Sequence, residues 1–454
     1  MRAYQFKKAL LPEGWADDVG VEVGDDGSIT RVTPGHAPEG AELVTGIALP
    51  GMPNLHCHAF QKGMAGLAER RGPVGDSFWT WREVMYRFLA QLTPDDVEAI
   101  AAYAYIEMLE AGFTTVGEFH YLHHDPAGQP YGDIGEMAAR IAAASAFTGI
   151  GLTLLPSLYT YGGFGGAAPN PGQIRFINST DRFVTLMERS REIVAKLPGA
   201  TIGIAPHSLR AVSPEQLREA AAVFAAGPVH IHAAEQTKEV DDCVASLGAR
   251  PVQWLLDEMG IDQRWCLIHA THMTEDETTR LARSGAVAGL CPLTEGSLGD
   301  GIFNGEIYLA AQGRFGIGTD SNIQIDAPAE LRQLEYSQRL KARARNVMTT
   351  TEGESTGRSL YARALAGGAQ ALGQPIGALA PGYRADILVL DADHPDLAGA
   401  SGDMVLDVLV FSAGRGLIKT VMTGGRPVVR DGRHQAREAI ARKYRDTVSR
   451  LANG

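Results

Sequence analysis

Apolar, strand-like segments alternate with helical patterns through the middle of the chain. We count eight such segments, at residues 46–53, 113–121, 150–159, 201–209, 229–235, 265–272, 286–295 and 315–323. Strands that are apolar on both faces and alternate with helices are typical of a parallel sheet that helices cover. Eight repeats predict an α/β fold with a (β/α)8 TIM barrel. An open doubly wound sheet is the alternative, but no GxGxxG sequence follows the first strand.

Two β-rich ends flank this middle region. Residues 21–32 alternate apolar and polar positions around an Asp-Gly turn, which predicts a hairpin. Three further strand-and-turn segments are expected near the other end, at 382–393, 405–414 and 417–433. A final helix is expected at 435–451. We therefore predict a small β-sandwich domain built from residues 1–48 and 376–454, joined to a barrel at 49–375.

Composition narrows the class of protein. The 454 residues are 45% hydrophobic and 21% charged, which is typical of a folded globular protein. The formal net charge of −12 argues against nucleic acid or an anionic membrane as the main partner. The four cysteines are too few and too scattered for a disulfide framework.

Neither an export signal nor a membrane span is expected. The first ten residues contain no apolar core of signal-peptide length. Residues 141–174 carry no charge, but they include Pro, many Gly and several Ser and Thr residues, which favours a buried helix, a strand and a loop. We therefore expect a soluble, cytoplasmic protein.

Histidines gather where the apolar segments end. Ten of the thirteen histidines lie between His56 and His272, mostly at the predicted strand ends. Active sites of (β/α)8 barrels lie at the carboxyl ends of the strands. The histidine positions therefore agree with the barrel prediction and place a candidate site at that end.

The residue types at these strand ends suit a metal ion. In an extended segment, the side chains of His56 and His58 point to the same side and can reach one metal ion. A lone His-x-His pair could also be two polar residues of a loop. His232, His269 and Asp320 end later strands, and Asp320 could alternatively cap a helix. Three His nitrogens and one carboxylate suit a single divalent ion, Zn²⁺ or, by ligand type, Fe²⁺.

Glu235 adds a candidate acid–base group. It lies three residues after His232, close enough to serve a water molecule that the metal activates. A bound metal lowers the pKa of water towards about 7, so a nucleophile forms at neutral pH. Glu235 would then act first as general base and later as general acid.

Four of these segments, PGMPNLHCH, HIHAAE, LIHATH and GIGTDS, resemble the amidohydrolase superfamily in their order and strand positions. The resemblance implies metal ligands at His56, His58, His232 and Asp320. It also implies catalytic roles for Glu235, His269 and Asp320. Two-metal members carry a Lys at the end of the fourth strand, and here that strand ends TIGIAPHSLR, which favours one metal. One-metal members with His-x-x-Glu are mostly deaminases that act on a C=N carbon.

Further segments resemble the formimidoylglutamate deiminases, a family within this superfamily. These are HAFQKGMAGL, SFWTWREVMY, GEFHYLHHD, PHSLRAV, HAAEQTKEV and CPLTEGSLGDGIF. The implied reaction belongs to histidine degradation and converts N-formimino-L-glutamate and water to N-formyl-L-glutamate and ammonia. The resemblance also implies a homodimer and five substrate-binding residues, namely Gln61, Arg82, Tyr121, His207 and Arg210.

The substrate residues have plainer alternatives. A dianionic amino acid needs bidentate cationic donors, and Arg82 and Arg210 supply them near the expected pocket mouth. Arg82 could instead be surface charge on a helix, and Arg210 could form a salt bridge to a neighbouring loop. Tyr121 could simply pack, and His207 could be structural. Two neighbouring groups are expected to have no functional role. His123 and His124 are expected to lie in a solvated loop, and Glu295 is expected to form a hydrogen bond with nearby backbone.

Three rival functions remain open. A purine, pterin or triazine deaminase would share the metal site, but its pocket would be apolar and aromatic without two arginines. A ring-opening amidohydrolase such as imidazolonepropionase would release no ammonia. A non-enzymatic assembly protein that keeps the barrel fold without its activity would have lost the metal ligands. Here the four candidate metal ligands, His269 and Glu235 are all present.

Overall fold

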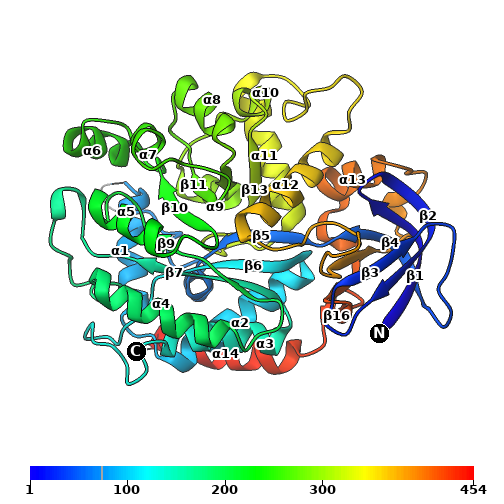
Figure 1. Cartoon of the computed structure of the whole chain (residues 1–454), viewed down its shortest axis with the longest axis horizontal. Helices are drawn as coiled ribbons and strands as arrows, with labels where there is room; N and C mark the ends of the chain where they lie inside the picture. Colours follow the sequence, from blue (N-terminus) through cyan, green and yellow to red (C-terminus); the bar gives the residue numbers. More distant parts are fainter. Residues whose placement is uncertain (73–74, 454) are drawn as a thin grey trace.

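The computed structural model describes residues 1–72 and 75–453. In Figure 1 helices surround a set of strands on one side, and a separate sheet lies at the right. That sheet joins the blue N-terminal strands to orange segments from the C-terminal part of the chain. The predicted division into a barrel and a small β domain made from both ends is therefore confirmed.

The barrel has eight strand positions, and seven lie at the predicted segments. The first is displaced, because residues 46–50 of the segment predicted at 46–53 belong to β4 (Glu42–Pro50) of the small domain, and the barrel strand is formed by the residues that follow. The fourth is split into two short strands, and the set is β5 (Met52–Cys57), β6 (Phe113–His120), β7 (Gly151–Leu158), β8 (Thr201–Ile202), β9 (Ala205–Pro206), β10 (Val229–Ala233), β11 (Trp265–His269), β12 (Val287–Leu290) and β13 (Arg314–Ile317). They pair in parallel as two sheets, β5 to β9 and β10 to β13. Isolated parallel bridges join the sheets at both edges, between Ile204 and Val229 on one side and between Cys57 and Asp320 on the other.

Helices follow the strands and cover them. The α-helices of the barrel are α1 (Phe78–Leu89), α2 (Pro94–Glu110), α3 (Glu136–Thr148), α4 (Thr180–Val194), α5 (Pro214–Val223), α6 (Thr237–Leu247), α7 (Pro251–Glu258), α8 (Glu275–Ser284), α9 (Pro292–Leu298), α10 (Gly305–Ala310), α11 (Ala327–Ala342) and α12 (Thr356–Leu372). A short 3-10 helix, η1 (Ala59–Met64), directly follows the His56-x-His58 pair. This alternation is the (β/α)8 arrangement that the hydrophobic pattern predicts.

The small domain has one continuous hydrogen-bonded path of strands rather than two separate sheets. In sequence order its strands are β1 (Arg2–Leu11), β2 (Gly14–Val23), β3 (Ile29–Thr33), β4 (Glu42–Pro50), β14 (Ile387–Leu390), β15 (Ile418–Thr423), β16 (Arg426–Arg430) and β17 (Arg433–His434). Strand β4 lies between the two halves, because it pairs with β1 in parallel and with β14 in antiparallel orientation. Sequence-distant ends therefore share one sheet.

The strand expected at 405–414 is wrong. These residues form the short helix α13 (Met404–Val408) and the helical turn η4 (Leu409–Ala413). Leu406 and Leu409 are buried in the main core, and Asp407 accepts hydrogen bonds from the N-terminus of α12. A short apolar run without alternation fits a buried helix as well as a strand, so periodicity alone does not decide between them.

The chain ends in a helix that packs on the barrel. Helix α14 (Arg437–Asn453) matches the helix expected at 435–451 and runs beneath α2 in Figure 1. The rings of Tyr103 and Tyr444 stack with centroids 4.1 Å apart. The Tyr444 hydroxyl also donates to the Lys62 carbonyl oxygen at 3.2 Å. The last helix thus contacts η1, the segment that follows the histidine pair.

Two further sequence expectations can be compared with the structure. All four cysteines are free and buried, in agreement with the absence of a disulfide framework. Within residues 1–72 and 75–453, none of the helices combines the length and apolar character needed to cross a membrane.

Helix α12 lies very close to the barrel strands, and this closeness depends on glycine. A Cβ atom at Gly367 would overlap the carbonyl oxygen of Phe315 on β13. This oxygen belongs to the backbone, so it cannot move aside by a change of side-chain rotamer. We expect Gly367→Ala to lower the free energy of unfolding by about 3 kcal/mol, because overpacking against rigid backbone is costly. Thermal and urea unfolding measure this loss.

Gly296→Ala is the matched control, since Gly296 also lies within a helix. Its Cβ would meet only the end of the Gln333 side chain, at 3.3 Å. Equal stability of the two variants would contradict the proposed packing constraint.

Candidate active site

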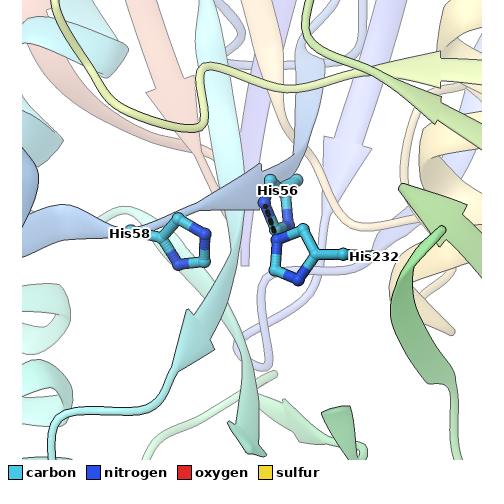
Figure 2. Close-up of side chains that lie close together, drawn as sticks. All are labelled: His56, His58 and His232. Carbon is cyan, nitrogen blue, oxygen red and sulfur yellow. Dashed lines mark hydrogen bonds between the residues drawn. The ribbon is translucent and has the colours of Figure 1, made fainter. Parts of the chain in front are cut away.

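Three histidines converge at the carboxyl ends of the strands. His56 lies on β5, His58 follows it with the same orientation, and His232 lies on β10. One ligand nitrogen from each ring lies within 4.8 Å of the others, and all three residues are buried. Figure 2 shows the three rings around a common space, with His56 Nε2 and His232 Nε2 3.2 Å apart. The geometry therefore suits a shared metal ion.

Backbone carbonyl groups set the tautomers of two of these rings. The Nδ1 atom of His58 lies 2.9 Å from the Phe119 carbonyl oxygen, and that of His232 lies 2.9 Å from the His207 carbonyl oxygen. A carbonyl oxygen can only accept, so Nδ1 carries the proton on each ring and the Nε2 lone pair faces the cluster.

Burial keeps the three rings uncharged. It lowers the pKa of His56 to about 3, and it lowers the pKa of His58 and His232 as well. Neutral imidazole is the form that binds metal, so no proton has to be displaced at neutral pH.

Asp320 supplies a carboxylate to the same cluster. Its Oδ1 atom lies 3.5 Å from His56 Nε2 and 3.4 Å from His58 Nε2. Burial alone would raise the pKa of Asp320, but the contacts with His56 and His58 lower it below its usual range. The Asn322 side chain donates to the carbonyl oxygens of Asp320 and His58, which fixes the two segments together. Asp320 is thus held ionised beside the three histidines.

Glu235 and His269 lie beside the three histidines and face each other. Glu235 is buried, with Oε1 3.7 Å from His269 Nε2 and Oε2 3.8 Å from Arg210 Nη2. Burial raises the pKa of Glu235 to about 7, which suits a group that exchanges protons at neutral pH. His269 Nε2 also lies 3.8 Å from Asp320 Oδ2, so His269 connects the carboxyl group of Glu235 to the metal cluster.

One pocket contains nearly all of the site residues that the sequence predicts. His58, His232 and Asp320 line it together with Glu235, His269 and the predicted substrate residues Gln61, Arg82, Tyr121, His207 and Arg210. His56 is fully buried and joins this group through His232. The structure therefore places all eleven predicted residues in one site.

The two arginines keep donors free for a ligand. The Nε atoms of Arg82 and Arg210 are buried and have no hydrogen-bond partner among the described residues. The guanidinium group of Arg82 lies over the Trp79 ring at 4.7 Å, and that of Arg210 lies over the same ring at 5.9 Å. Arg82 therefore faces the pocket rather than bulk solvent, and the salt bridge of Arg210 is to Glu235 inside the site.

The other predicted substrate residues have mixed surroundings. Tyr121 is buried, and its hydroxyl accepts a hydrogen bond from Gln61 Nε2 at 2.8 Å. The Oε1 atom of Gln61 has no partner among the described residues, so it is available to a donor on a ligand. His207 Nδ1 lies 3.1 Å from the Ser208 hydroxyl, while its carbonyl oxygen orients His232.

The pocket walls are more aromatic than the sequence analysis anticipated. Between the polar groups lie Phe78, Trp81, Met85, Tyr86, Tyr159, Phe176 and Leu298. Four of these residues lie on helix α1, Leu298 ends helix α9, and Tyr159 and Phe176 lie in the segment after β7. No single stretch of sequence therefore indicates an aromatic wall. Aromatic residues were expected for a purine pocket and two arginines for a dianionic amino acid. This pocket contains both.

Two acidic residues near His269 were not recognised as parts of the site. Glu295 accepts the Cys291 N–H at 2.8 Å, as expected for a backbone bond, but its Oε1 atom also lies 3.2 Å from His269 Nδ1. Asp300 is buried and accepts from the Gln236 side chain. Burial, together with nearby Glu235, raises the pKa of Asp300 to about 9. The signal in the sequence is their position, since Glu295 ends the seventh predicted strand and Asp300 follows it.

The expectation of a solvated His123-His124 pair is wrong. Both residues are buried, with exposed fractions of 1% and 0%. His123 Nε2 lies 3.0 Å from the Ser157 carbonyl oxygen, and His124 Nε2 lies 3.0 Å from that of Ile177. Their rings satisfy backbone carbonyl groups of neighbouring segments, which explains how two polar residues can lie in the interior.

Comparisons with known proteins show which family the chain belongs to. The family model described as "Amidohydrolase family" matches residues 47–428, and "Formimidoylglutamate deiminase HutF, N-terminal domain" matches residues 1–44. The formimidoylglutamate deiminase of Pseudomonas aeruginosa is 52% identical over 99% of this chain and 100% of its own length. A 5-methylthioadenosine/S-adenosylhomocysteine deaminase of Natronomonas pharaonis is 29% identical over 85% of this chain and 82% of its own.

A solved structure is similar along the whole chain. The crystal structure of an amidohydrolase from Brucella melitensis has a TM-score of 0.95 and 50% sequence identity, and the match covers 100% of both chains. The chain therefore belongs to the amidohydrolase family and, within it, to the relatives of formimidoylglutamate deiminase.

Proposed function

We propose that this protein hydrolyses N-formimino-L-glutamate to N-formyl-L-glutamate and ammonia, a step of histidine degradation. The observation that carries the proposal is the pairing of Arg82 and Arg210, with free buried donors, in the same pocket as Glu235 and the histidine cluster. Two cationic forks suit a substrate with two carboxylates. The 52% identity to a formimidoylglutamate deiminase supports the same substrate.

The proposal includes a single divalent metal ion, Zn²⁺, held by His56, His58, His232 and Asp320. The donor set supports it, since three neutral imidazoles and one carboxylate converge and two of the Nε2 lone pairs are oriented inward by backbone carbonyls. Fe²⁺ accepts the same donors, so metal analysis of the purified protein decides between them. When bound, such an ion lowers the pKa of water enough to supply a nucleophile at neutral pH.

The side chains of the pocket then divide the work. Arg82 and Arg210 bind the two carboxylates, and Gln61, Tyr121 and His207 add hydrogen bonds to the amino acid. Water attacks the formimino carbon, and Glu235 takes a proton from it and delivers that proton to the terminal nitrogen. Glu235 then carries the remaining hydroxyl proton of the adduct to the same nitrogen, so that the carbon–nitrogen bond breaks, ammonia leaves, and a formyl C=O stays on the amino nitrogen.

The domain limits, assembly and location belong to the same proposal. We place the barrel at residues 49–375 and the small domain at 1–48 and 376–454, with β4 as the connection between them. A homodimer is expected from the family resemblance, and light scattering of the purified protein tests it. The cytoplasmic location stays a prediction.

The first experiment measures ammonia release by the zinc-loaded protein and by the chelated protein. The substrates are N-formimino-L-glutamate, its aspartate analogue, guanine and S-adenosylhomocysteine. We expect metal-dependent release with a high kcat/KM for formiminoglutamate alone or far above the others. Release only from a purine substrate would contradict the carboxylate-binding roles of the arginines. It would leave the proposal of a metal site intact.

Replacement of Glu235 by Gln tests the acid–base role. The amide cannot carry the proton, so kcat should fall by roughly 10²- to 10⁴-fold while the metal content stays unchanged. Because only ionised Glu235 accepts a proton, kcat/KM of the native protein should fall as pH drops below about 7, its raised pKa. A pH–rate profile measures this acid limb.

Glu258→Gln is the control for this substitution, since Glu258 is a solvent-accessible carboxylate paired with Arg218 far from the pocket residues. Near-native turnover of Glu235→Gln would disprove its role as the proton carrier.

Arg82→Met and Arg210→Met test the recognition of the two carboxylates. Each loses a charged, bidentate donor, and such bonds contribute about 1.5–3 kcal/mol, so KM should rise roughly 10- to 100-fold. Arg210→Met should also move the acid limb to higher pH, because Arg210 lowers the pKa of Glu235. Arg218→Met, at a solvent-accessible pair with Glu258, is the control. Unchanged KM in both variants would refute the assignment.

A further inference from the structure

His269 differs from the other site histidines in the partner of its Nδ1 atom. His58 and His232 place Nδ1 against backbone carbonyl oxygens, whereas His269 places Nδ1 3.2 Å from the carboxylate of Glu295. The same Glu295 oxygen accepts the Cys291 N–H at 2.8 Å, which fixes the carboxylate in place. Both His269 and Glu295 are buried, so this contact is shielded from water.

The opposite edge of the His269 ring also faces carboxylates. Its Nε2 atom lies 3.7 Å from Glu235 Oε1 and 3.8 Å from Asp320 Oδ2. Both distances are longer than a hydrogen bond, so Nε2 faces the two carboxylates without a bond to either.

The backbone at His269 is also held in an uncommon conformation. His269 has φ 68° and Ala270 has φ 48°, so two consecutive residues without the freedom of glycine lie in the left-handed region. The Ala270 N–H donates to the Ala233 carbonyl oxygen at 3.0 Å, which ties this bend to the neighbouring strand. The bend and the Glu295 contact together determine where the ring points.

We infer that Glu295 is the positioning residue for His269, and that it holds the ring with Nε2 directed at the oxygen that attacks the formimino carbon. The inference rests on the proposed function. The Glu295 oxygen accepts the Cys291 N–H and also lies against His269 Nδ1, so Nδ1 donates to it and the ring is fixed with Nε2 on the side of Glu235 and Asp320. Backbone carbonyls orient His58 and His232, whereas a side chain orients His269.

Glu295→Gln tests this role by kinetics. The amide keeps the size of the side chain but loses the charge that strengthens the hydrogen bond from His269 Nδ1. We expect kcat to fall roughly 10- to 100-fold, the usual cost of losing such an orienting partner, with KM changed less than about threefold and metal content unchanged. A rise in KM with unchanged kcat would overturn the inference.

Glu330→Gln is the matched control. Glu330 is another fully buried carboxyl group, and its Oε2 atom accepts the Leu293 N–H of α9 at 2.9 Å. Among the described residues, no hydrogen bond or ion pair joins Glu330 to His269. We expect near-native kcat and KM for this variant. A loss equal to that of Glu295→Gln would assign the effect to burial of an amide rather than to His269.

A double-mutant cycle separates positioning from a general structural effect. In a His269→Gln background, Glu295→Gln should cause no further loss of kcat, because its effect passes through the imidazole. Equal losses in both backgrounds would overturn the inference, because Glu295 would then act independently of His269.

A spectroscopic measurement keeps this test separate from the proposed substrate. In zinc-loaded protein labelled with ¹⁵N-histidine, the His269 signals are identified by their loss in His269→Gln. We expect a protonated Nδ1 in the native protein and a shifted Nδ1 signal in Glu295→Gln. Unchanged signals would refute the positioning role, whereas failure to release ammonia from formiminoglutamate would refute only the proposed function.

Discussion

Exclusion of water from the strand ends is the constraint on which the rest of the site depends. Burial lowers the pKa of His56, His58 and His232, so the rings stay neutral and their lone pairs remain available. The same burial raises the pKa of Glu235 to about 7. One physical condition therefore prepares both the candidate metal ligands and the proposed proton carrier, which in water would have quite different pKa values.

The sheet itself orients the histidine rings of this buried site. The carbonyl groups of Phe119, on β6, and His207, after β9, belong to segments beside β5 and β10. Strand register thus decides which nitrogen of His58 and His232 is protonated. His269 instead takes its orientation from a carboxylate side chain, which lies on helix α9 after the seventh strand. The geometry of His269 therefore depends on this helix as well as on the sheet.

The predictable features were those with a local pattern. The spacing of His56 and His58, the strand-end positions of His232 and Asp320, and the eight apolar runs all follow from period and order along the chain. The helix at 405–414 has no such period, and its burial against the barrel decided its form. The contact between His269 and Glu295 joins the end of β11 to helix α9, so no spacing in the sequence reveals it.

The docking of helix α14 has a consequence for the order in which the molecule is made. The histidine pair leads into η1 early in the chain, but the Lys62 carbonyl of η1 meets Tyr444, which is synthesised almost last. Strand β4 likewise waits for β14 to complete its sheet. Contacts between such distant segments slow folding and leave surfaces exposed during translation. A nascent chain can therefore carry its metal-binding sequence long before the ribosome delivers the segments that close around it.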